Sequence, residues 1–190
     1  GATLFISLKE DFLDFQKLAY YIQENEISIF FITTALFNSL VDTEPLEFKK
    51  LKYVLFGGER VSVAHVKEFR ERLSWVNLVH VYGPTESTTF SSYHPVENID
   101  EDFGTIPIGK PISNTQIYIL NSQKELTPVN VAGEICIGGD GLSRGYLNQP
   151  ELSSEKFVSN PFQEGEKIYK TGDLGRRLPD GSIEFIGRKD

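Results

Sequence analysis

One short run of chemically capable residues, Tyr82-Gly-Pro-Thr-Glu86, directly follows an apolar stretch typical of a buried strand. Tyr82 offers a flat face for a purine, Thr85 a hydroxyl for a phosphate, and Glu86 a hard oxygen ligand for Mg²⁺. Open α/β sheets bind ligands at the carboxyl ends of their strands, so this position favours a nucleotide site. The alternative is an ordinary Gly-Pro turn with a capping threonine.

A second run, Tyr169-Lys-Thr-Gly-Asp173, ends in an aspartate. A carboxylate that follows a Thr-Gly turn can accept hydrogen bonds from both hydroxyls of a ribose. The alternative is an Asx-type turn with no ligand.

Other motifs do not support a different chemistry. The glycines from Gly139 to Gly145 resemble a dinucleotide-binding turn, but the chain runs from them to Pro150 rather than into a helix, which favours a plain turn. The sequence has no Walker phosphate loop and no HExxH motif. The histidines have no metal-ligand spacing, so we interpret them as structural: His65, His80 and His94.

The elements that must position these residues differ between the two halves. Before about residue 100, the pattern predicts helices at 12–22, at 35–41 and after an N-cap at Ser62, and apolar strands at 27–32, 53–56 and 76–82. From residue 104, strand-like runs follow closely at 116–120, 133–137, 167–170 and 182–186. We therefore expect an α/β plus β fold, a parallel sheet with flanking helices followed by an antiparallel, barrel-like β subdomain.

Composition excludes several classes. The formal net charge of −8 argues against a nucleic-acid partner. The single cysteine, Cys136, excludes a disulfide framework and fits a reducing compartment. No apolar run approaches the roughly 20 residues of a membrane span. The chain of 190 residues begins at Gly1 and contains no methionine, so we expect an internal fragment of a longer protein.

Together, the motifs resemble one family. Residues 82–86, 133–157, 169–174 and 187–190 have the order and spacing of adenylate-forming enzymes, and over essentially the whole chain they most resemble the amino-acid adenylation domains of nonribosomal peptide synthetases. Two alternatives stay open. One is a fragment of a D-alanine–carrier ligase or an acyl-CoA synthetase-type enzyme. The other is a non-catalytic binding module, against which the presence of both Glu86 and Asp173 argues.

The resemblance implies an activity and its partners. Such domains use ATP and Mg²⁺ to convert an amino acid into an aminoacyl-adenylate, and then load it as a thioester on phosphopantetheine. The expected partners are the peptidyl carrier domain and the condensation domain of the same synthetase, in the cytoplasm. Its implied boundaries are 1–103 for a partial α/β subdomain, 104–186 for the β subdomain, and 187–190 for a hinge.

The resemblance also assigns roles. Thr85 would contact the α-phosphate and Glu86 would hold Mg²⁺, and these are the expected catalytic residues. Asp190 would be the hinge. The position two before the motif tyrosine is usually asparagine, and here it is His80, whose neutral ring can still accept a hydrogen bond from adenine. The residues expected around adenine and ribose are Gly57, Gly58, Glu59, His80, Tyr82, Asp173, Phe185 and Arg188.

The implied substrate pocket carries no charged residue. It is expected to be lined by Phe31, Leu55, Gly57, Val81, Thr89 and Phe90. A buried pocket without a charge rejects charged side chains, so we expect isoleucine, leucine or valine as the substrate. The alternative is that some of these residues belong to the ordinary core.

Parts of the family's site are missing from the sequence. The phosphate loop and the substrate-binding aspartate would lie upstream, and the lobe with the adenylate-contacting lysine downstream. We therefore expect the isolated chain to be inactive and to self-associate through surface that those parts would cover.

Overall fold

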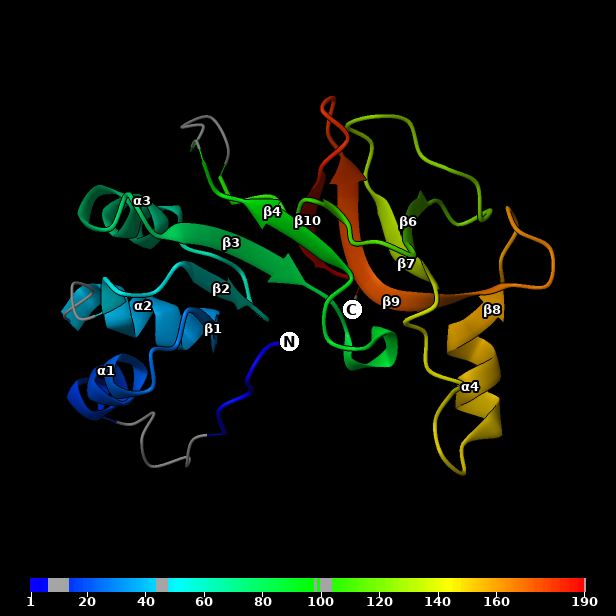
Figure 1. Ribbon diagram of the computed structural model, residues 1–190. Coiled ribbons are helices and arrows are strands. Elements are labelled where there is room, and N and C mark those ends of the chain that lie inside the picture. Colours follow the sequence, from blue (N-terminus) through cyan, green and yellow to red (C-terminus); the bar gives the residue numbers. More distant parts are fainter. Residues whose placement is uncertain (7–13, 44–47, 98, 100–103, 190) are drawn as a thin grey trace. The chain divides into compact units, whose positions relative to one another are not determined.

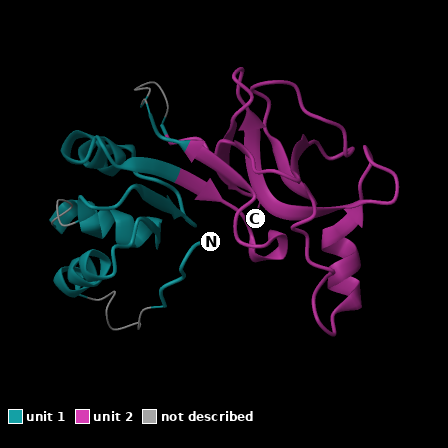
Figure 2. Cartoon of the chain, viewed as in Figure 1, with its two compact units in different colours: residues 1–79, 95–104 teal, residues 80–94, 105–190 magenta. Residues whose placement is uncertain are grey.

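The computed structural model describes residues 1–6, 14–43, 48–97, 99 and 104–189 (Figure 1). The chain divides into two compact units, residues 1–79 with 95–104 and residues 80–94 with 105–190 (Figure 2). The sequence-derived boundaries at 103 and 186 stay a proposal.

The first unit packs helices on a parallel strand pair. Its elements are α1 (Phe15–Glu24), β1 (Ile29–Thr33), α2 (Thr34–Thr43), β2 (Tyr53–Gly57), α3 (Val63–Arg72) and the start of β3 (Asn77–Tyr82). Helix α1 begins after Asp14, whose carboxylate accepts hydrogen bonds from the backbone N–H groups of the first turn. Phe12, which the sequence placed in this helix, lies outside the described residues.

One face of the β1–β2 pair is buried by aromatic packing. Strands β1 and β2 are parallel, with Ile32 opposite Phe56. The Phe37 ring on α2 stacks on Phe56 at 4.6 Å and lies 5.4 Å from Phe69 on α3. Alternate residues face the other way, and there Ile29 is 60%, Phe31 43% and Tyr53 43% exposed. This leaves an apolar face on the first unit.

The N-terminus of α3 lacks the capping hydrogen bond that the sequence predicts. Ser62 occupies the N-cap position, but its side chain makes no capping bond to the backbone. Its hydroxyl instead lies 2.7 Å from Nδ1 of His65. The predicted helix is present, and its predicted cap is replaced by a side-chain contact.

Beyond the end of β3, the elements that follow are a 3-10 helix (Thr85–Ser87), β4 (Ser92–Pro95), β5 (Lys110–Pro111), β6 (Thr115–Leu120), β7 (Gly133–Gly139), α4 (Pro150–Lys156), β8 (Phe157–Ser159), β9 (Lys167–Arg177) and β10 (Ile183–Arg188). Strand pairing in the first sheet follows β1-β2-β3-β4-β5.

The second unit is built on a curled antiparallel sheet of order β10-β9-β7-β6, with β8 paired to β9. Its core is a cluster of isoleucines, including Ile135 and Ile137, against which Tyr82 and Phe185 pack.

The predicted fold class, a helix-covered α/β part followed by a barrel-like antiparallel part, is confirmed. The sequence did not predict α4, β4, β5 or β8. It also placed Asp173 after a turn, whereas Asp173 lies inside β9, which continues to Arg177. The pairing of β7 with β9 is interrupted between Glu134 and Cys136, and β9 has extra residues opposite this interruption. The expected turn is therefore a β-bulge within a continuous strand.

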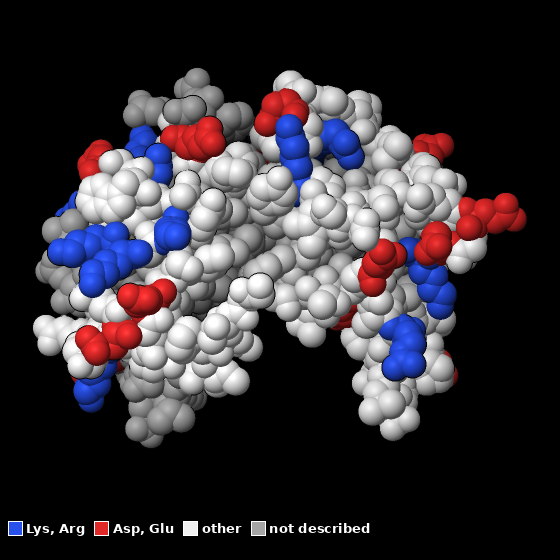
Figure 3. All heavy atoms as spheres, in the orientation of Figure 1, with Lys and Arg blue, Asp and Glu red and all other residues white. Residues whose placement is uncertain are grey.

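None of the helices in the described part of the chain has the length and apolarity needed to span a bilayer. On the face shown in Figure 3, basic and acidic side chains are interspersed over both units.

Candidate active site

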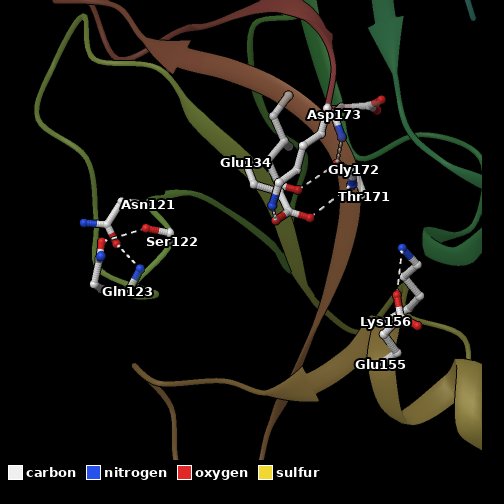
Figure 4. A network of polar contacts seen from close by, with 11 residues as sticks. Asn121, Ser122, Gln123, Glu134, Glu155, Lys156, Thr171, Gly172 and Asp173 are labelled. Atoms are coloured by element: carbon white, nitrogen blue, oxygen red, sulfur yellow. Dashed lines mark hydrogen bonds and ion pairs between the residues drawn. The ribbon is translucent and has the colours of Figure 1, made fainter.

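Hydrogen bonds within the bulge in β9 fix the backbone that leads into Asp173. The Thr171 hydroxyl donates a hydrogen bond of 2.7 Å to the carbonyl of Ile135, and it accepts one of 2.9 Å from the backbone N–H of Asp173. The N–H of Gly172, which has a φ of 76°, donates to Oε1 of Glu134 at 3.3 Å (Figure 4). A bulge redirects a side chain that a regular strand would point elsewhere.

Around Asp173 the structure gathers predicted nucleotide-site residues from three strands of the second unit. The Tyr82 phenol donates a hydrogen bond of 2.6 Å to Oδ2 of Asp173. Nη1 of Arg188 lies 3.3 Å from Oδ1. The ring of Phe185 lies 6.3 Å from that of Tyr82, inclined by 40°. An aromatic ring and an anionic acceptor therefore stand side by side, as a nucleoside requires.

Electrostatics keep the Tyr82 phenol neutral. Burial raises the pKa of Tyr82 well above its ordinary value, and the negative charge of Asp173 raises it further. Asp173 itself is only 7% exposed. Tyr82 is therefore a hydrogen-bond donor at physiological pH.

The loop that follows Tyr82 is tightly constrained. A side chain on Gly83 would meet the carbonyl oxygen of Thr89 at 2.6 Å and the nitrogen of Ser91 at 2.7 Å. Two consecutive β-branched residues, Thr88 and Thr89, have positive φ angles of 51° and 71°. Such conformations are uncommon for threonine and concentrate at functional sites.

Glu86, at the centre of this loop, is held by a tyrosine. The Tyr146 phenol donates a hydrogen bond of 2.6 Å to Oε1 of Glu86. Burial would raise the pKa of Glu86, but hydrogen bonding by Tyr146 and Tyr169 and the charge of Arg188 bring it below its usual range. Glu86 is thus an ionised carboxylate at neutral pH.

The residues present fit a magnesium ion held with a nucleotide. Among the described residues, no group of three or more His, Cys, Asp or Glu side chains could form a complete metal site. Mg²⁺ in ATP sites commonly takes one or two carboxylates and completes its shell with phosphate oxygens and water. Glu86 would supply that carboxylate, and Thr85, which is exposed beside it, would face the phosphates.

His80 is buried with a defined tautomer. Its Nδ1 lies 2.8 Å from the carbonyl oxygen of Pro107, and because a carbonyl only accepts, Nδ1 carries the proton. Burial lowers the pKa of His80 to about 4. At neutral pH Nε2 is therefore an acceptor, which is the property the adenine role requires.

The remaining predicted residues are divided between the units. Phe31 and Leu55 are paired directly across β1 and β2, and Gly57 ends β2. Gly58 and Glu59 follow as exposed residues of the same unit. Val81, which is buried, and Thr89 and Phe90 belong to the second unit. Asp190, the expected hinge, lies outside the described residues.

Sequence reasoning missed the residues that support the site. Thr171 and Glu134 shape the bulge, and Tyr146 and Tyr169 surround Glu86. Their motifs were noted, but nothing in the motifs alone indicates that Tyr146 reaches a residue 60 positions earlier.

The chain combines a helix-covered α/β unit with a curled antiparallel β unit. The second unit carries the aromatic ring of Tyr82 and the carboxylates of Asp173 and Glu86. This combination is typical of proteins that bind adenine nucleotides. Residues 1–147 match the family described as AMP-binding enzyme, and the chain belongs to this family.

Individual relatives are synthetases. All 190 residues are 50% identical to part of surfactin synthase subunit 1 of Bacillus subtilis (strain 168), of which the chain spans only 5%. The solved structure of PA1221, a nonribosomal peptide synthetase protein containing adenylation and PCP domains, is similar over 92% of this chain and 36% of its own, with 35% identity and a TM-score of 0.86. The synthetase FmoA3 in an alpha-methyl-L-serine-AMP bound form matches 92% of this chain and 20% of its own, with 32% identity and a TM-score of 0.84. The resemblance drawn from the motifs, a nonribosomal peptide synthetase adenylation domain, is confirmed.

Proposed function

We propose that the protein containing this chain uses ATP to convert an amino acid into an aminoacyl-adenylate and pyrophosphate. The observation that carries the proposal is the Tyr82–Asp173–Arg188 group on the second unit. It is supported by similarity to FmoA3, which is described with an aminoacyl-AMP bound.

The side chains suit each part of such a nucleotide. Adenine would stack on Tyr82 against Phe185, with His80 Nε2 accepting from its amino group. The ribose hydroxyls would donate to Asp173, and Arg188 would lie beside them. Thr85 would donate to the α-phosphate. Gly57, Gly58 and Glu59 are further residues that we propose for adenine binding.

Charge neutralisation is the main chemical requirement. When the amino-acid carboxylate attacks the α-phosphorus, a P–O bond forms and the bond to pyrophosphate breaks. Mg²⁺, when bound, neutralises charge on the phosphate oxygens. The role of Glu86 is to hold that ion with an ionised oxygen at a fixed position.

The substrate we propose is isoleucine, leucine or valine. The pocket residues Phe31, Leu55, Gly57, Val81, Thr89 and Phe90 include no charged side chain. A charged substrate would lose its hydration there without compensation. Discrimination among the branched side chains would rest on single methylene groups, worth about 1–3 kcal/mol each.

We also propose that the adenylate is passed to the phosphopantetheine of a carrier domain, next to a condensation domain, in the cytoplasm. PA1221, which contains both adenylation and PCP domains, supports the first partner. The buried free thiol of Cys136 is consistent with a reducing compartment. For the isolated chain, we propose self-association through the apolar face of β1 and β2.

The test is ATP–pyrophosphate exchange by the full-length protein with a panel of amino acids. Isoleucine, leucine or valine should give the highest exchange, and aspartate and lysine none. Glu86→Gln and Asp173→Ala should abolish it, while Glu164→Gln, on an exposed turn, should leave it unchanged. Exchange driven best by D-alanine, or by a fatty acid, would support the alternative enzymes. No exchange with any carboxylate would contradict the proposal.

A further inference from the structure

Two segments that are distant in sequence meet at Glu86. The Tyr146 phenol donates to Oε1 of Glu86 at 2.6 Å, and its oxygen lies 3.2 Å from that of Tyr169. The two phenols and the carboxylate form a short hydrogen-bonded chain that ends at one carboxylate oxygen.

The backbone of the same segment also holds the Glu86 loop. The N–H of Ser143 donates to the carbonyl of Glu86 at 2.8 Å. The Thr88 hydroxyl donates to the carbonyl of Gly141 at 2.7 Å. Glu86 is therefore fixed at its main chain and at its side chain by residues 141–146.

Tyr146 is itself held rigidly. Its backbone N–H donates to the Ser153 hydroxyl at 2.8 Å, and that hydroxyl donates to the carbonyl of Gln149 at 2.7 Å, at the start of α4. Its ring meets the edge of Phe157 at 5.7 Å, and Phe157 lies 5.0 Å from Tyr169. The donor that reaches Glu86 has little freedom to move.

The chemical type of the donor matters. A lysine or arginine at this place would orient the carboxylate, but would also cancel the negative charge that a cation needs. A neutral phenol fixes one oxygen and leaves the charge in place. This is the arrangement by which outer partners commonly orient metal ligands.

We propose that Tyr146 is a positioning residue that aims Glu86 at the magnesium ion of the bound nucleotide, with Tyr169 as its support. The inference rests on the proposed function, because Glu86 is the proposed magnesium ligand.

The test uses the full-length protein and the variant Tyr146→Phe, which keeps the ring packing and removes the donor. The Mg²⁺ concentration that gives half-maximal pyrophosphate exchange should rise about 10-fold, with a smaller change in the rate at saturating Mg²⁺. Mn²⁺ binding in the presence of a nonhydrolysable ATP analogue, measured by electron paramagnetic resonance without turnover, should weaken by a similar factor.

The matched control is Tyr118→Phe. Tyr118 stacks on Phe162 at 4.8 Å and its phenol contacts Asn160, so the change removes a phenol of the same unit away from Glu86. It should leave both Mg²⁺ dependence and Mn²⁺ binding unchanged. Tyr169→Phe should shift both in the same direction as Tyr146→Phe, but less, and it carries the test if Tyr146→Phe does not fold.

Each outcome decides something different. A lower melting temperature in Tyr146→Phe with unchanged Mg²⁺ dependence and Mn²⁺ affinity would assign Tyr146 a purely structural role and refute the proposal. Weakened Mn²⁺ binding in a protein whose wild type shows no exchange would uphold the positioning role and refute the proposed reaction.

Discussion

The Tyr82 phenol donates a hydrogen bond of 2.6 Å to Oδ2 of Asp173, joining two residues that are 91 positions apart in the sequence. Arg188 approaches the other carboxylate oxygen, Oδ1, at 3.3 Å. If Asp173 binds ribose, the two hydroxyls must exchange with these protein partners. We therefore expect replacement of the acceptor, Asp173, and replacement of the donor, Tyr82, to affect nucleotide affinity differently.

Replacing Asp173 and Tyr82 separately tests that prediction. Asp173→Asn removes the charged acceptor, and since hydrogen bonds to charged groups contribute about 1.5–3 kcal/mol, the affinity for a nonhydrolysable ATP analogue should fall at least about 10-fold. Tyr82→Phe keeps the stacking ring and removes only the competing donor, so affinity should stay within about 3-fold of wild type. Isothermal titration of the full-length protein measures both. A larger loss in Tyr82→Phe than in Asp173→Asn would contradict this assignment.

His80 predicts a pH dependence of stability. Burial lowers the folded-state pKa from 6.5 to about 4, so the unfolded chain takes up a proton first as the pH falls. The stabilisation by neutral His80 is present above pH 6.5 and is lost as the pH falls from 6.5 to about 4, to a total of about 3 kcal/mol.

Urea unfolding across that range measures the loss. His80→Asn carries no titrating group, so its free energy of unfolding should depend less steeply on pH between 6.5 and 4. Carboxylates titrate in both proteins and cancel in the comparison. Equal slopes in wild type and variant would show that His80 does not titrate as its burial predicts.

The sequence predicted most of the framework because that part is local. Short apolar runs such as residues 53–56 favour strands, and β2 appears there. The absence of α4 from the predicted elements has a local reason too. Proline ends a helix when it lies inside one, but it is favoured in the first turn, and here Pro150 begins α4.

The supporting contacts of the site could not be predicted because they depend on pairing between distant strands. The bulge that turns Asp173 arises from the register between β7 and β9, which no residue pattern reveals. The donor to Glu86 comes from Tyr146, beyond an intervening loop and several strands. The residue types indicated a nucleotide site, whereas the pairing of distant strands determines how each side chain of that site is held.

Gly83 predicts a stability effect with a matched control. Gly83→Ala would place a Cβ within 3 Å of the backbone of Thr89, Phe90 and Ser91, which cannot move aside as a flexible side chain could. Such overpacking costs about 1–3 kcal/mol. Gly104→Ala adds the same methyl where no atom of the described residues lies within 4 Å, and its free energy of unfolding should match wild type. Equal stabilities of the two variants in urea unfolding would refute the claimed close approach.

The apolar face of the first unit predicts self-association of the isolated chain. Ile29 and Tyr53 lie directly opposite each other on β1 and β2 and are 60% and 43% exposed. Contiguous apolar surface of this kind favours association, because burying it against a second copy removes it from water. The double variant Ile29→Lys with Tyr53→Lys should shift the chain toward monomer in light scattering at high concentration. Lysines at the exposed positions Gln123 and Glu164, in turns of the second unit, provide a control and should leave association unchanged. A wild-type chain that is strictly monomeric at high concentration would contradict the prediction.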